Sequence, residues 1–177
     1  KAFKQDAIKN RYANWTELLD YCYLSAAPVG RYVLDVHGES NTAYDASDAL
    51  CSVLQVLNHV QDCREDFILL NRVYLPLDFI EDETVISKSL SKTNSGPVFR
   101  VLLDRVLNET DNLITRASTL PSLLKSRRLA MEVQAIINIA NCLSKLLYIK
   151  DPLSERVCLS KRQYIWNVVC GVVKVMI

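Results

Sequence analysis

Two aspartates one helical turn apart are the residues of this sequence best suited to chemistry. Asp62 and Asp66 lie within residues 55–76, QVLNHVQDCREDFILLNRVYLP. In a helix that turns by about 100° per residue, Gln55 and Asn58 share a face with the two carboxylates. Like charges at this spacing repel each other, but Mg²⁺ binds carboxylate oxygens together with the phosphate oxygens of a substrate. The stripe therefore indicates a site for a divalent cation and a phosphate group.

The spacing by itself is also typical of a solvated helix face. Asp78 and Asp82 repeat it after a proline, where they indicate a loop or a helix start. The first pair differs because the rest of its helix is apolar, which predicts that the helix is buried among neighbours. The residues expected on that apolar side are Leu50, Val53, Leu54, Val56, Leu57, Val60 and Phe67.

The segment Asn71-Arg72-Val73-Tyr74-Leu75-Pro76 directly follows the acidic pair. Together they resemble the second aspartate-rich motif of the squalene/phytoene synthase family, the all-helical head-to-head prenyl transferases. Earlier in the chain, Tyr21-Cys22 and Pro28-Val29-Gly30-Arg31 resemble the same family, in the form of its hydroxysqualene synthase branch. The resemblance extends from about Phe3 to Lys161.

The resemblance implies a role for each matching residue. The family holds Mg²⁺ ions between two aspartate-rich motifs, and these ions bind and remove a diphosphate from a prenyl substrate. Carried onto this chain, Asp62 and Asp66 are metal ligands and catalytic residues, and Tyr21 faces the reacting carbons. The implied substrate-binding residues are Gln55, Asn58, Arg72, Tyr74, Ser25 and, as a weaker phosphate candidate, Arg11.

Small residues around Ser25, Ala26, Ala27 and Gly30 have two interpretations. They can mark a close contact between two helices, or they can line a groove for a prenyl chain beside the Tyr21 hydroxyl. The spacing favours neither.

Two departures from the family pattern bear on function. Many members have arginine before the first aspartate, where this chain has Gln61; the exchange fits the hydroxysqualene branch. The first aspartate-rich motif is absent from these 177 residues. We therefore expect residues 1–177 to form a single helical domain, the C-terminal two-thirds of a prenyl synthase domain, with half of its metal site.

The apolar periodicity predicts an all-α fold, an incomplete isoprenoid synthase bundle of about six helices. Asn14 caps a helix through His37 that Pro28 bends, and Asp45 caps the central helix through Leu70. Further helices are expected over residues 83–90, 98–117 and 122–148, and from Ser160 to Val175. Leu120-Pro121-Ser122 interrupts the pattern.

The composition excludes several classes of protein. A net charge of +1 gives no basis for nucleic-acid binding. The six cysteines form no metal-binding or C-x-x-C pattern, which favours reduced thiols and a cytoplasmic protein. The apolar tail VVCGVVKVMI predicts a packed terminal helix. The alternative for this tail is peripheral contact with the inner membrane.

The resemblance implies an enzyme acting on prenyl diphosphates with Mg²⁺. The favoured reaction converts presqualene diphosphate to hydroxysqualene, and the sibling reaction condenses two farnesyl or geranylgeranyl diphosphates. The alternative is a non-catalytic member of the family that acts as a protein-binding or respiratory-complex assembly factor.

Overall fold

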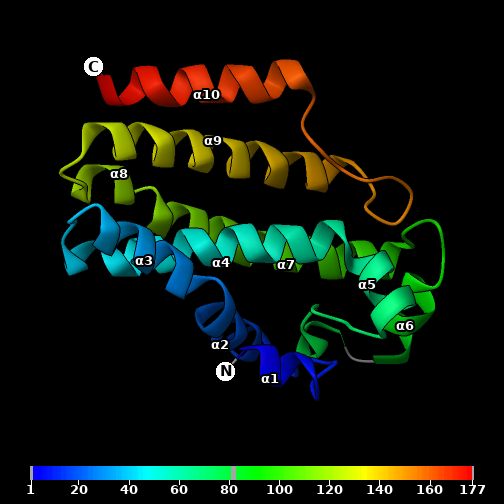
Figure 1. Ribbon diagram of the computed structural model, residues 1–177. Coiled ribbons are helices and arrows are strands. Elements are labelled where there is room, and N and C mark those ends of the chain that lie inside the picture. Colours follow the sequence, from blue (N-terminus) through cyan, green and yellow to red (C-terminus); the bar gives the residue numbers. More distant parts are fainter. Residues whose placement is uncertain (1, 81–82, 177) are drawn as a thin grey trace.

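A computed structural model describes residues 2–80 and 83–176 as a stack of helices (Figure 1). No β-strand occurs in these residues, so the predicted all-α class is confirmed. The helices are α1 (Ala2–Asp6), α2 (Trp15–Ser25), α3 (Ala27–Val36), α4 (Tyr44–Gln61), α5 (Cys63–Leu70), α6 (Glu83–Leu90), α7 (Pro97–Ala117), α8 (Leu120–Leu123), α9 (Arg127–Ile149) and α10 (Lys161–Met176), with 3₁₀ turns η1 (Asn41–Ala43) and η2 (Leu77–Phe79).

The long helices lie in layers that follow the chain. In Figure 1, α10 lies along α9, α9 covers the layer made by α4 and α7, and α2 and α1 lie beneath that layer. The acidic stripe is on α4 and α5. Helix α2 lies on one side of the stripe, and the segment after α5 lies beside α2. No helix in the described ranges is both long and apolar enough to cross a membrane.

Three of these helices begin at a residue whose side chain caps the helix N-terminus. Asn14 Oδ1 accepts a hydrogen bond from the Glu17 N–H at 2.9 Å, and Ser160 Oγ accepts one from the Gln163 N–H at 3.3 Å. Ser126 caps α9, which starts at Arg127 because residues 120–123 form the separate short helix α8. The prediction of one helix over 122–148 is thus wrong at its beginning.

Two predicted long helices are each divided in two, which is why the bundle has more than about six helices. The first ends at Ser25, and α3 restarts at Ala27 with Pro28 in its first turn, where the missing N–H costs no hydrogen bond. The central helix is interrupted at Asp62, whose ψ of 8° departs from helical geometry. Asp45 does not cap this helix; it lies in the first turn of α4, and Ser40 caps the preceding turn η1.

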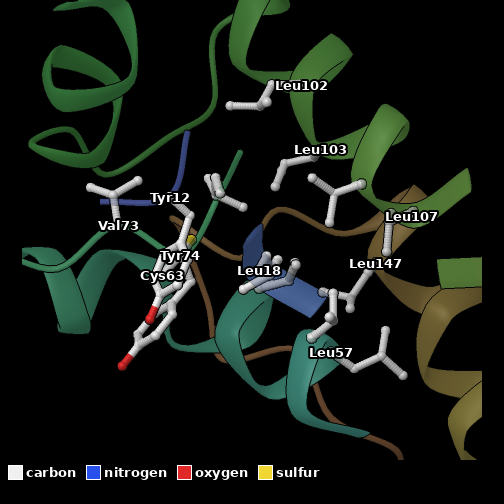
Figure 2. Close-up of a cluster of buried hydrophobic side chains, with 14 of the residues drawn as sticks. Tyr12, Leu18, Leu57, Cys63, Val73, Tyr74, Leu102, Leu103, Leu107 and Leu147 are labelled. Carbon is white, nitrogen blue, oxygen red and sulfur yellow. The ribbon is translucent and has the colours of Figure 1, made fainter. Parts of the chain in front are cut away.

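The core lies where α4, α7 and the aromatic segment around Tyr74 meet. Leu57, Leu103 and Leu107 are buried there (Figure 2). Leu54 is expected on the buried side of α4 but is 40% exposed. The apolar residues of this helix extend further around its circumference than the part that other elements cover. All six cysteines are free thiols, and burial raises the pKa of Cys22 and of Cys63 to about 12.

The small residues of α3 make a close helix contact. A Cβ atom placed on Gly30 would lie 2.5 Å from Cys51 Sγ and 2.6 Å from Ser47 Oγ of α4. Ala27 is completely buried. Of the two interpretations of this segment, the geometry at Gly30 supports helix–helix packing, since no room for a prenyl chain is left there.

Candidate functional site

A cluster of four stacked rings joins α2, α4 and the segment after α5. The His59 ring stacks on the Tyr74 ring, with centroids 3.5 Å apart and planes inclined by 13°. Tyr21 lies 6.0 Å from His59 and 5.6 Å from Tyr74, and Tyr12 lies 5.5 Å from Tyr21. Figure 2 shows the hydroxyl groups of Tyr12 and Tyr74 on the same side, pointing away from the leucine core. We refer to these four rings, of Tyr12, Tyr21, His59 and Tyr74, as the wall. The side of the wall that carries the tyrosine hydroxyl groups is its polar edge.

His59 connects this wall to the acidic stripe. Its Nε2 lies 3.0 Å from Gln55 Nε2, and its Nδ1 lies 3.9 Å from Asp66 Oδ2. The ring itself is buried, with 7% of its side chain exposed, whereas 22% of Asp66 remains exposed. The imidazole thus lies between an amide and a carboxylate that the sequence places on one face.

The polar edge of the wall also includes Arg72 and α1. Arg72 Nη1 donates to Tyr74 Oη at 3.4 Å, and Arg72 Nη2 donates to the Asp6 carbonyl at 2.5 Å. Burial, with the neighbouring Tyr74 hydroxyl and Asp6 carboxylate, raises the pKa of Tyr21 far above its ordinary value. Burial raises the pKa of Tyr12 in the same way. Both phenols are therefore neutral hydrogen-bonding groups at physiological pH.

Two buried polar atoms at this edge lack a protein partner. Within the described residues, Tyr12 Oη and Asp6 Oδ1 are buried without a hydrogen bond. Buried polar atoms are rarely unsatisfied in proteins, because each lost hydrogen bond to water is costly.

Asp62 lies at the junction of α4 and α5, beside a different part of the chain. Its Oδ1 is 3.9 Å from Arg156 Nη2, and 25% of its side chain is exposed. The preceding Gln61 does not point into the site: its Nε2 donates to the Val157 carbonyl at 2.5 Å. The side chain that replaces the family's arginine therefore anchors the segment before α10, and that segment brings Arg156 to Asp62.

The donor set fits one half of a magnesium site. Asp62 and Asp66 are mostly buried carboxylates, 25% and 22% exposed, and they contact different neighbours, Arg156 and His59. Mg²⁺ is commonly held by one or two carboxylates with water and substrate phosphates. In residues 2–80 and 83–176, no group of three or more histidine, cysteine or acidic side chains is placed to hold a metal ion. The chain thus offers two carboxylate ligands and leaves the remaining positions to water and substrate.

Three other predicted residues lie outside the ring cluster. Ser25 Oγ donates to the Tyr21 carbonyl of its own helix at 2.9 Å. Asn58 is exposed on α4, at the edge of the stripe. Arg11 donates through Nη2 to Asn71 Oδ1 at 2.9 Å, at the C-terminal end of α5, where Asn71 has a positive φ of 52°. Of the second acidic pair, Asp78 is exposed on η2, and Asp82 lies outside the described residues.

The structure adds four residues to the site that the sequence analysis did not name as candidates. His59 follows Gln55 by four residues and precedes Asp66 by seven, so the helical period contained the signal. No sequence pattern identified the other three residues, Tyr12, Asp6 and Arg156. Each of them reaches the site from a segment distant in sequence from the stripe.

Comparisons with known proteins agree with this architecture and with the motif. Residues 1–163 match the model of the family described as squalene/phytoene synthase. The hydroxysqualene synthase of Sinorhizobium fredii is 44% identical over 159 residues, which are 90% of this chain and 54% of that protein. The hydroxysqualene synthase of Zymomonas mobilis is 41% identical over 157 residues, 89% of this chain and 53% of that protein. The chain thus spans about half the length of these relatives.

Solved structures give the same result. The squalene synthase HpnC of Alicyclobacillus acidocaldarius superposes with a TM-score of 0.73 at 28% identity, over 82% of this chain and 55% of that one. A dehydrosqualene synthase in complex with a ligand superposes with a TM-score of 0.79 over 99% of this chain and 62% of that one; at 18% identity it shows the fold alone. The match to the family model over residues 1–163, together with these relatives, shows that this chain belongs to the squalene/phytoene synthase family.

Proposed function

We propose that the protein acts on a prenyl diphosphate and releases the diphosphate with the help of Mg²⁺ held by Asp62 and Asp66. The observation that carries this proposal is the continuous set of contacts from Asp66 through His59 to Tyr74 and Tyr21. The Asp66 carboxylate thereby lies beside a buried cluster of aromatic rings, which supports a cation site next to apolar surface. Bound Mg²⁺ would neutralise the charge that develops on the departing diphosphate.

The residues of the chain divide this task among them. Asp62 and Asp66, which are 25% and 22% exposed, provide carboxylate oxygens at one end of the stripe. Arg72, fixed by the Tyr74 hydroxyl and the Asp6 carbonyl, places a positive charge beside the wall, where a diphosphate oxygen can accept a hydrogen bond. The rings of Tyr21 and Tyr74 keep water away from the reacting carbons, so that a carbocation is not quenched before it rearranges.

For the reaction itself, we propose the conversion of presqualene diphosphate and water to hydroxysqualene and diphosphate, in which water adds to the cation after it has rearranged. The two relatives named hydroxysqualene synthase, at 41% and 44% identity, support this branch over condensation of two farnesyl diphosphates. These names also favour an enzyme over a non-catalytic assembly factor. Peripheral association of this protein with a membrane remains a prediction, because the proposed prenyl substrates are hydrophobic.

Incubating the full-length protein with presqualene diphosphate and Mg²⁺ tests the proposal. Formation of hydroxysqualene with stoichiometric release of diphosphate, abolished by EDTA and restored by excess Mg²⁺, is the expected result. Farnesyl diphosphate in place of presqualene diphosphate serves as the control for the sibling reaction. Absence of diphosphate release from both substrates would refute the enzymatic proposal.

Replacement of Tyr21 by phenylalanine is expected to leave diphosphate binding intact and to lower turnover by about tenfold, because one hydrogen bond at the reacting end is lost. The product distribution is expected to change as well. The buried ring remains in the variant, so its melting temperature should stay near that of the wild type. Product analysis by gas chromatography, together with binding of inorganic pyrophosphate, measures both effects; full turnover with unaltered products would remove Tyr21 from the site.

A further inference from the structure

We propose that His59 is a positioning residue that fixes the Asp66 carboxylate for cation binding. The inference rests on the proposed function, since it assigns His59 a part in the same site. Its observational basis is the buried imidazole between Gln55 and Asp66.

The contacts of His59 fit a ring that bears its proton on Nδ1. The Gln55 atom that faces the ring is the amide nitrogen, 3.0 Å from His59 Nε2. An amide nitrogen only donates hydrogen bonds, so Nε2 is the acceptor, and in the neutral imidazole the proton resides on Nδ1. Nδ1 is the atom that faces Asp66 Oδ2 at 3.9 Å. Gln55 thereby turns the N–H edge of the ring toward the carboxylate.

The surroundings of the ring prevent it from turning away. Its face is stacked on Tyr74 at a centroid distance of 3.5 Å, and Tyr21 lies 6.0 Å away. Val56 and Val60 beside it on α4 are buried in the core. An oriented N–H group next to a carboxylate restricts the orientations that this carboxylate can adopt. Loss of an outer partner that holds a metal-binding carboxylate typically costs 10–100-fold in metal affinity. At 3.9 Å, His59 Nδ1 lies close enough to reach Asp66 with a small side-chain rotation.

Four variants of the full-length protein separate this role from a role in packing alone. His59→Phe keeps the ring on Tyr74 but has neither nitrogen. His59→Asn places an amide nitrogen where Nδ1 lies, and His59→Gln places one where Nε2 lies, next to Gln55 and away from Asp66. Asp66→Asn is the reference for loss of the metal ligand itself.

The measurements are calorimetric binding of Mg²⁺ with inorganic pyrophosphate, and the Mg²⁺ concentration at half-maximal turnover. We expect His59→Phe and His59→Gln to weaken binding and to raise the half-maximal Mg²⁺ concentration by about tenfold or more. We expect turnover at saturating Mg²⁺ to recover and His59→Asn to restore most of the affinity. Melting temperatures establish that each variant is folded.

The outcomes distinguish the inference from the function on which it rests. Wild-type affinity in His59→Phe, or equal affinities in His59→Asn and His59→Gln, would overturn the role of His59 while Asp66→Asn still loses binding. If His59→Phe does not fold, the comparison of the asparagine and glutamine variants decides the question. If the wild-type protein itself binds no magnesium pyrophosphate, the proposed function is contradicted, and the inference is contradicted with it.

Discussion

Replacement of Asp66 by asparagine is expected to slow diphosphate release by roughly 100-fold or more, because a metal-held leaving group gains several kcal/mol from its bound cation. Asp62→Ala is expected to have a similar effect, since Asp62 is the other proposed metal ligand at the stripe. Both side chains are mostly buried, 22% and 25% exposed, so the melting temperature of each variant is measured beside its turnover. Release of phosphate from a coupled pyrophosphatase reaction follows the rate directly.

Asp78→Asn is the matched control for these two variants. Asp78 belongs to a second acidic pair with the same sequence spacing, but it lies exposed on η2. Its replacement is therefore expected to leave both turnover and the Mg²⁺ requirement unchanged. Undiminished turnover in the Asp66 and Asp62 variants would exclude both residues as metal ligands. An assembly factor, by contrast, would retain its partner and its phenotype in these variants.

Replacement of Gly171 by alanine is expected to lower the free energy of unfolding by about 1–3 kcal/mol, which is typical of an extra methyl group in a tightly packed contact. A Cβ atom at this position would lie 2.6 Å from both Cα and N of Ala135, so it meets the backbone of α9. A backbone cannot move aside as a flexible side chain can, and α10 must shift away from α9. Each kcal/mol corresponds to roughly 2–4 °C in melting temperature for a domain of this size.

Alanine replacements of two other glycines provide a comparison for the stability of the Gly171→Ala variant. Gly96→Ala is expected to cost about 1 kcal/mol or less, because no atom lies within 4 Å of the added Cβ and the change affects only the N-cap of α7. Gly30→Ala should fall between the two, since the added Cβ meets the side chains of Cys51 and Ser47, which can rotate. Differential scanning calorimetry on the three variants measures the order. A Gly171→Ala protein as stable as Gly96→Ala would show that α10 does not need its close contact with α9.

The sequence determined the fold class and the family, and the acidic stripe stays a prediction. These follow from local rules: apolar residues repeat with the helical period, and Asp62 and Asp66 are one turn apart in any helix. The caps at Asn14 and Ser160 were predictable for the same reason, because each bond joins residues three positions apart. The break at Asp62 was not, since the residue lacks the proline or glycine that normally signals an interruption.

Only the tertiary structure decided which polar residues meet at the stripe. Tyr12 and Arg156 approach it from segments distant along the chain, through contacts that depend on how the helices pack. Packing also decided between the two interpretations of the small residues, because the clearance at Gly30 depends on the side chains that α4 presents to it. His59 is an intermediate case: its place in the stripe follows from the helical period, but its role depends on Tyr74, which the fold brings against its ring.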